Sequence, residues 1–151
     1  MSRAQPPSQR RIALDTNAVI YYLDRREPYR SWLQPLVVSM AAGEREFVLS
    51  VVVDVELRVK PLRDGDAEAL RTIDALLAAP AVELVPVTIG IARRAATIRS
   101  NTDLALPDAI IVATAVVSGC DALIGNDRAC ARRVTEIPYI YLDEVAGRIP
   151  V

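Results

Sequence analysis

Five short runs of apolar and β-branched residues recur along the chain, and segments with helical spacing separate them. Short runs of this composition are typical of β-strands. Because the strands alternate with helices, the pattern predicts about five βα units in an α/β fold. We therefore expect a three-layer α/β/α sandwich with a central parallel five-stranded sheet. The predicted strands span residues 11–14, 47–49, 82–85, 122–124 and 139–142.

Capping residues and prolines mark where the intervening helices begin. Ser31 can cap a helix that stops at Gly43, Thr88 can cap residues 89–99, and Pro107 suits the first turn of residues 107–117. The apolar spacing of residues 66–79 also predicts a helix.

Ser50 can cap a further helix over residues 51–60, which is expected to end before Pro61. This run is rich in β-branched residues, so a continued strand is the alternative.

The length of 151 residues fits one domain, and 52% apolar with 25% charged residues is a globular composition. The polar N-terminus contains Pro6 and Pro7 and lacks the apolar stretch of a secretory signal. The longest apolar run, residues 109–117, falls short of the roughly 20 residues that span a bilayer. We expect a disordered tail at residues 1–10, one domain at residues 11–151, no membrane partner and a cytoplasmic location.

The chain contains no histidine, which narrows its possible chemistry. Serine-histidine triads, histidine general bases and zinc sites with imidazole ligands are excluded. Cys120 and Cys130 lack the spacing of a metal site and are expected to be reduced and partly buried. Any hydrolysis would then depend on carboxylates, on cysteine or on a metal held by oxygen.

The net charge of −1 provides no overall attraction to nucleic acid. The basic residues, however, are almost all arginines, which can grip phosphate with two hydrogen bonds. Taken singly, each arginine cluster is better explained as a solvated helix face. The clusters fall within residues 25–26, 58–63, 93–99 and 128–133.

Four acidic residues stand where a parallel sheet can gather ligands. Asp15 directly follows the first predicted strand and Asp127 follows the fourth, while Glu56 and Asp108 lie on the neighbouring helices. In open parallel sheets, ligands bind beyond the carboxyl ends of the strands, where the strand order reverses. Mg²⁺ and Mn²⁺ prefer hard oxygen ligands. The sequence therefore predicts a divalent cation site at this edge.

Each acid also has an ordinary structural explanation. Asp15 can form a turn or a helix cap after the first strand, and Asp108 can complement the positive end of a helix dipole. Asp54 competes with Glu56 for the cleft. Because residues two apart on a helix point to different faces, at most one of this pair is expected there.

Four segments resemble the motifs of the PIN domain family, in the same order and over most of the chain. Residues 13–20 (ALDTNAVI) are similar to the opening motif and residues 50–57 (SVVVDVEL) to the second. Residues 106–115 (LPDAIIVATA) are similar to the third and residues 119–127 (GCDALIGND) to the fourth. The chain is also similar in size to the VapC toxins of bacterial toxin-antitoxin pairs.

The resemblance implies an α/β/α fold and endonucleolytic cleavage of RNA that depends on Mg²⁺ or Mn²⁺. It also implies a homodimer and a cognate VapB-like antitoxin that blocks the site. By position in the motifs, the catalytic and metal-binding residues would be Asp15, Glu56, Asp108 and Asp127. Residues that support these ligands or contact the substrate would be Thr16, Asn17 and Asn126.

Gly125 departs from the family pattern, because many relatives carry Thr or Ser there, and a hydroxyl near Asp127 is expected to be missing.

Two other enzyme classes fit the sequence less well than the PIN domain family. A HAD-type phosphatase needs an acid where Asn17 stands, and a receiver domain needs a late lysine, whereas the only lysine is Lys60. The stronger alternative is a non-catalytic PIN-like module that binds RNA or protein.

Overall fold

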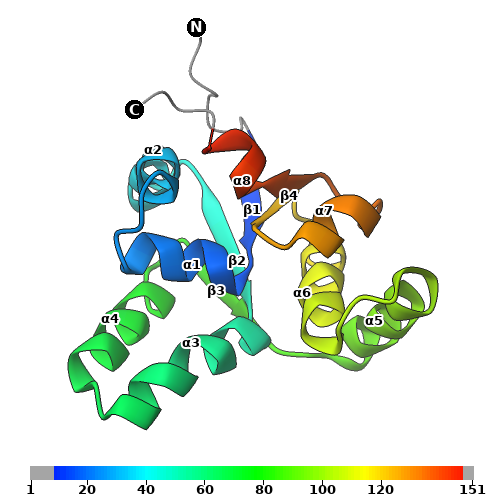
Figure 1. The fold of residues 1–151 in the computed structure, drawn as a ribbon, viewed down its shortest axis with the longest axis horizontal. Helices are drawn as coiled ribbons and strands as arrows, with labels where there is room; N and C mark the ends of the chain where they lie inside the picture. The colour runs from blue at the N-terminus through cyan, green and yellow to red at the C-terminus, as the bar shows by residue number, and fades with distance from the viewer. Residues whose placement is uncertain (1–8, 148–151) are drawn as a thin grey trace, which may run out of the picture.

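The computed structural model describes residues 9–147, which form a parallel five-stranded sheet between helices (Figure 1). The strand order is β3-β2-β1-β4-β5, so β1 lies at the centre and the chain changes direction across the sheet between β1 and β4. The predicted fold class is confirmed. The strands are β1 (Arg11–Leu14), β2 (Glu46–Ser50), β3 (Val82–Val85), β4 (Ala122–Gly125) and β5 (Tyr139–Tyr141).

Helices cover both faces of the sheet. In Figure 1, α1 to α4 lie on one side, and α5 and α6 lie on the other. Neither layer contains a helix long and apolar enough to cross a membrane within residues 9–147. The helices are α1 (Thr16–Leu23), α2 (Tyr29–Ala41), α3 (Val51–Asp64), α4 (Ala67–Leu77), α5 (Ile89–Thr102), α6 (Leu106–Val117), α7 (Arg128–Arg133) and α8 (Leu142–Val145).

Side-chain caps begin several helices as the sequence predicts. Ser50 Oγ accepts a hydrogen bond from the Val52 N–H at the start of α3. Thr88 Oγ1 accepts one from the Ile91 N–H at the start of α5. Each cap satisfies a backbone donor that has no partner within its helix, which is why these residues fix the helix starts.

Several helix boundaries differ from the prediction, including those of α2 and α3 and the end of α5, which lies at Thr102. The α2 helix begins at Tyr29, before Ser31, and its first residue follows Pro28 without a side-chain cap. The α3 helix runs through Pro61 and ends at Gly65, which adopts a left-handed conformation with φ 66°. Pro61 removes one N–H but keeps its carbonyl, which accepts a hydrogen bond from the Asp66 N–H, so the helix continues to its glycine end.

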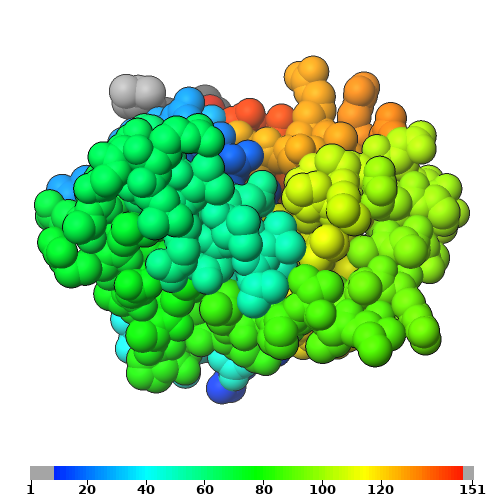
Figure 2. Space-filling model, turned by 90° about the horizontal axis from the view of Figure 1, so that it is seen from below, coloured from blue at the N-terminus to red at the C-terminus, as the bar shows by residue number. Residues whose placement is uncertain are grey.

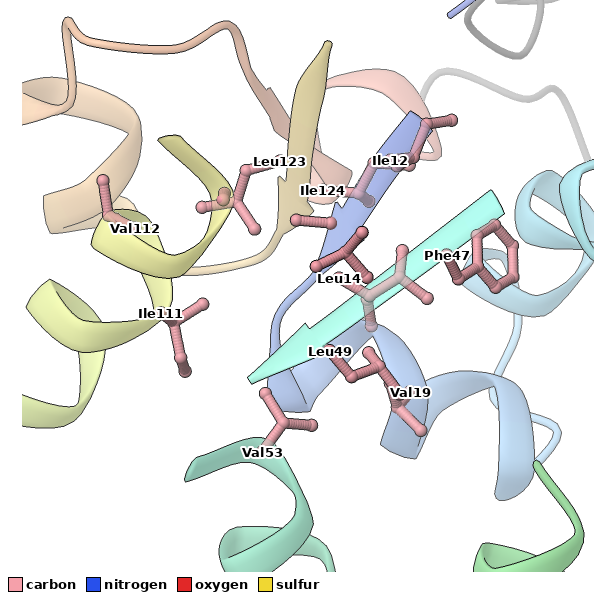
Figure 3. Close-up of a cluster of buried hydrophobic side chains, with 14 of the residues drawn as sticks. Ile12, Leu14, Val19, Phe47, Leu49, Val53, Ile111, Val112, Leu123 and Ile124 are labelled. Carbon is pink, nitrogen blue, oxygen red and sulfur yellow. The ribbon is translucent and has the colours of Figure 1, made fainter. Parts of the chain in front are cut away.

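The core forms where apolar strands meet apolar helix faces. Side chains of β1, β2 and β4 project toward those of α1, α3 and α6 (Figure 3). Every residue of β4 is buried, as expected for a strand that is covered on both faces. Leu36 of α2 and Ile12 of β1 are fully buried in this core. The sheet is thus a rigid platform for the loops at its ends.

Hydrogen bonds and ion pairs hold the start of β1 in the sheet. The Arg10 and Arg11 N–H groups donate to the Asp121 carboxylate, at 3.2 and 2.9 Å. The Arg11 guanidinium bridges Glu46 and Glu83 on the next two strands, at 2.7 and 2.6 Å. Arg10 therefore takes part in the fold, whereas residues 1–8 of the predicted disordered tail lie outside the described residues.

Removing a core contact on α2 should destabilise the whole domain. We expect Leu36→Ala to lower the free energy of unfolding by roughly 2 to 5 kcal/mol, because it leaves a cavity in the core. Val38→Ala, at a position that is 57% exposed on the same helix, should change it by less than about 0.5 kcal/mol. Urea denaturation of both variants measures the difference. Equal midpoints would contradict this view of the core.

Candidate metal centre

The four predicted acids line one open cavity of about 270 Å³ beyond the carboxyl ends of β1 and β4. This edge is where the strand order changes direction, as the sequence predicts for a ligand site. Figure 2 shows the molecule from this side, with α3 on one flank and α5 and α6 on the other. The cavity is lined by Asp15, Thr16, Asn17, Ile20, Glu56, Asp108, Ile111 and Asp127.

Asp15 is both a helix cap and a residue of the cavity. Its Oδ1 accepts a hydrogen bond from the Ala18 N–H at 2.9 Å, which caps α1. Its Oδ2 accepts one from the Asn126 N–H at 3.2 Å, across the junction between β1 and β4. The capping explanation of this residue is therefore correct and compatible with a place in the site. The two N–H donors fix the direction in which the carboxylate faces.

Asp108 and Asp127 approach each other from two helix starts. Asp127 caps α7 by accepting a hydrogen bond from the Cys130 N–H at 2.8 Å, and Asp108 lies in the first turn of α6. One carboxylate oxygen of each, together with the Cys130 Sγ, form a group whose members lie within 4.8 Å of one another. The N-termini of two helices thus present their partial positive charge to this pair of acids.

Glu56 reaches the cavity from α3 with the help of α1. The Thr16 hydroxyl donates a hydrogen bond to the Glu56 carboxylate at 2.5 Å. The rival acid, Asp54, instead forms an ion pair with Arg58 at 2.6 Å and lines no part of this cavity. Asn17 is exposed on the cavity wall. Thr16 thus positions the Glu56 carboxylate, and the Asn17 side-chain amide is accessible to a molecule bound in the cavity.

Asn126 supports the site from behind. Its side-chain amide donates to the Tyr21 hydroxyl at 3.1 Å and accepts from the Asp143 N–H at 2.8 Å. Because both ends of the amide are engaged away from the cavity, only the backbone N–H of Asn126 acts on Asp15 directly. The structure places this residue as a link between α1, the β4 end and α8.

Burial and mutual repulsion alter the acids. Burial is the largest cause that raises the pKa of Asp15 from 3.8 to about 6, and the charges of Asp108 and Asp127 add to it. The N–H donors from Ala18 and Asn126 oppose this rise. Burial also raises the pKa of Asp108 to about 6, with contributions from Asp127 and Glu56. The charges of Glu56, Asp108 and Asp127 therefore each raise the pKa of at least one other acid in the cavity.

Two residues near the site were missed by the sequence reasoning. Cys130 lies one helical turn after Asp127, so the spacing of three residues could have indicated its place. The cysteines are free, and Cys130 is buried, as expected. Tyr139 approaches from β5, and its hydroxyl accepts a hydrogen bond from the Asp127 N–H at 3.0 Å. No local pattern marks Tyr139, because its position depends on the pairing of β4 with β5.

The donor set fits a hard divalent cation. Carboxylate oxygens dominate the polar lining, and none of the described residues that line the cavity is basic. Four carboxylates without a counter-charge would repel one another, and this repulsion adds to the effect of burial in raising the pKa values of Asp15 and Asp108. Oxygen ligands around a shared opening are what Mg²⁺ and Mn²⁺ require. The ligands would be Asp15, Glu56, Asp108 and Asp127.

Several solved structures share the fold. VapBC2 from Rickettsia felis, bound to promoter DNA, matches with a TM-score of 0.71 and 15% identity, over 87% of this chain and 98% of that one. FitAcB from Neisseria gonorrhoeae matches with a TM-score of 0.66 and 20% identity, over 91% and 99% of the two chains.

VapC20 from Mycobacterium tuberculosis, described as a toxin that cleaves the sarcin-ricin loop, is a further structural neighbour. It matches with a TM-score of 0.65 and 17% identity, over 84% of this chain and 98% of that one. No curated protein sequence gives a significant match. The family model of the PIN domain matches residues 12–136, most of the sequence. With the fold and the cavity in agreement, the chain belongs to the PIN domain family.

Proposed function

We propose that this chain is a divalent-cation-dependent endoribonuclease of the VapC toxin type, acting in the cytoplasm. One observation carries the proposal: four acids from separate elements line one cavity at the switch point of the sheet. A scaffold with no catalytic role would not need to bury Asp15 among like charges, which raises its pKa to about 6. The fold shared with the sarcin-ricin loop cleaving toxin supports RNA as the substrate.

The chain's own groups would hold Mg²⁺ or Mn²⁺ and orient the RNA. Asp15, Glu56, Asp108 and Asp127 would bind the cation, with Thr16 keeping Glu56 in place. When bound, the cation supplies Lewis acidity at a phosphoryl oxygen and lowers the pKa of water. The products of phosphodiester hydrolysis by water would be a phosphate monoester and a free hydroxyl.

Two side chains at the mouth are available to the RNA. Asn17 lines the cavity and can donate to phosphate or ribose oxygens. Arg128 is exposed at the first position of α7, directly after Asp127, and its side chain forms no ion pair or hydrogen bond with other described residues. In contrast, Arg58 is held between Asp54 and Asp74. Single-stranded or looped RNA, whose phosphates can enter an open cavity, is the expected substrate class.

A VapB-like antitoxin is the proposed partner, and the structure offers it a groove beside the acids. A second cavity of about 250 Å³ lies between α1, α3 and α4, and it shares Ile20 and Glu56 with the acidic cavity. Its walls combine apolar side chains such as Leu57 and Ile73 with charged ones such as Lys60. A partner segment seated there would adjoin the acidic cavity and could block it.

Replacing two of the acids should abolish RNA cleavage. We expect Asp15→Asn and Asp108→Asn each to lower Mg²⁺-dependent cleavage of a single-stranded RNA by 100-fold or more, because each removes a charged ligand. Asp103→Asn, a matched change at a side chain that is 94% exposed, should cleave like the wild type. Excess EDTA should stop the wild-type reaction.

Growth arrest on expression should be lost in the same two variants, and co-expression with a cognate VapB-like antitoxin should relieve it in the wild type. The outcome that ends the nuclease proposal is cleavage by both variants at the wild-type rate, or full activity in EDTA. A wild type that binds RNA without cleaving it would favour the non-catalytic scaffold.

Burial of Asp108, together with repulsion from the neighbouring acids, should make stability depend on pH. The pKa of Asp108 is higher in the folded chain, about 6, than its ordinary value of 3.8, so folding favours the protonated form. Its contribution to stability is complete below pH 3.8 and is lost as the pH rises through about 6. Without metal at pH 7.5, Asp108→Asn should therefore be more stable than the wild type, by about 1 kcal/mol once solvent screening is allowed for.

Differential scanning calorimetry without metal, at pH 7.5 and pH 3.5, measures this difference, which should shrink at the lower pH. Adding Mn²⁺ at about 100 times its Kd should stabilise the wild type by about 2.7 kcal/mol. Asp108→Asn should gain much less from the same Mn²⁺ concentration. Identical melting temperatures of the two proteins at pH 7.5, with and without Mn²⁺, would show that Asp108 neither feels the other acids nor binds the cation.

The homodimer is also a proposal, and exposed apolar side chains support it. Val55 of α3 is 63% exposed and Ile89 of α5 is 72% exposed. Such side chains, where they join into a patch, mark interaction surfaces. We expect light scattering to give twice the chain mass of 16.5 kDa for the wild type.

The double variant Val55→Asp/Ile89→Asp should give the mass of a single chain, because charges would have to be buried in the interface. Val38→Asp/Val117→Asp, at positions that are 57% and 48% exposed, serves as the matched control and should remain dimeric. A wild type with the mass of one chain would contradict the dimer.

A further inference from the structure

The space beside the Gly125 Cα is filled by side-chain atoms of Asp15, which directly follows β1, and of Tyr139 on β5. A Cβ placed on Gly125 would lie 2.1 Å from Asp15 Oδ2 and 2.3 Å from the Tyr139 hydroxyl oxygen. Real Cβ atoms do not approach other atoms so closely. Residue 125 can therefore carry no side chain unless both of these oxygens move. The glycine at the end of β4 is a requirement of close packing here.

The strand register explains how Tyr139 reaches this point. Tyr139 on β5 pairs with Leu123 on β4, two residues before Gly125. Residues two apart on a strand face the same side, and two residues span roughly 6.6 Å. That distance is about the length of a tyrosine side chain. The phenol therefore extends from the start of β5 to the carboxyl end of β4, where a shorter side chain would not arrive.

The hydroxyl lies between two of the acids. Its oxygen accepts a hydrogen bond from the Asp127 N–H at 3.0 Å, and Asp15 Oδ2 borders the same point beside Gly125. Asp15 Oδ2 in turn accepts from the Asn126 N–H. One small region thus contains the backbone that carries Asp127, the carboxylate of Asp15 and the tyrosine oxygen.

We infer that Tyr139 is a positioning residue of the metal centre. Its hydroxyl, carried from β5 into the space that Gly125 leaves free, fixes the backbone of Asp127 and limits the movement of Asp15. Tyr139 would not touch the cation or the RNA, and it would act through the two acids. The inference rests on the proposed function only in taking Asp15 and Asp127 as cation ligands.

The test compares two tyrosines of the same strand in the full-length chain. Tyr139→Phe removes the oxygen and keeps the ring, whereas Tyr141→Phe makes the same change at a hydroxyl with no hydrogen bond to the described residues of the site. Titration calorimetry with Mn²⁺ alone should give a Kd at least about 10-fold higher for Tyr139→Phe, as is common when a group that supports a ligand is lost. Tyr141→Phe should match the wild type.

Melting temperatures without metal separate positioning from general damage. If Tyr139→Phe melts within a few degrees of the wild type and still binds Mn²⁺ less tightly, the inference holds. Equal Mn²⁺ affinity for the wild type and Tyr139→Phe would overturn it, as would an equal loss in Tyr141→Phe. If the wild type itself binds no Mn²⁺, the proposed metal-dependent function fails as well. Wild-type Mn²⁺ binding without RNA cleavage would count against the nuclease alone.

A second pair of variants keeps the inference testable if Tyr139→Phe melts early. Gly125→Ala places a methyl group against the tyrosine oxygen and Asp15. Without that oxygen, one of the two contacts disappears and the Asp15 carboxylate gains room to turn. Gly125→Ala should therefore lower the melting temperature less in the Tyr139→Phe background than in the wild type. Equal decreases in the two backgrounds would show that the hydroxyl does not occupy the position beside Gly125.

Discussion

The burial and mutual repulsion of carboxylates at the end of a parallel sheet are balanced in part by backbone N–H groups in this molecule. Asp15 accepts hydrogen bonds from Ala18 and Asn126, and Asp127 accepts one from Cys130. The Ala18 and Cys130 donors are available because the first N–H groups of a helix have no partners within the helix. The balance is incomplete, since the pKa of Asp15 still rises to about 6. A bound cation would complete it.

The same arrangement explains why capping and metal binding need not compete for one residue. A carboxylate has more lone pairs than a single cap uses. Asp15 and Asp127 both cap helices and both line the cavity. The helix dipoles of α1 and α7 favour negative charge at the points where the strands end. Local structure and site chemistry therefore select the same residue type at these two positions.

Much of the fold was predictable from the sequence, because the strands of a sheet covered on both faces are continuous runs of apolar residues. Strands at residues 11–14 and 82–85 were located with their observed bounds. The short helix α1 was not predicted as such, since its residues 18–23 form a continuous apolar run in which no helical period stands out. Pro61 was taken as an end of α3, yet the observed end is set by Gly65.

Some residues of the candidate site could also be predicted from the sequence, whereas others could not. Acids that follow strands can be found from the order of elements, so the sequence located all four acids that line the cavity. Tyr139 and the packing role of Gly125 depend on the register of β4 with β5, which no local pattern encodes. Gly125 itself brings no hydroxyl to Asp127, as expected. The hydroxyl of Tyr139 on the adjacent strand instead accepts a hydrogen bond from the Asp127 N–H.

The route by which the chain enters the sheet has a practical consequence. Arg10 and Arg11 are bound to Asp121 at the amino edge of the strands, and the acidic cavity opens at the carboxyl edge. A fusion partner, affinity tag or fluorophore attached upstream of Arg10 would therefore join the domain at the amino ends of the strands, opposite the edge that carries the acids. Reporters placed there would leave the mouth free for nucleic acid.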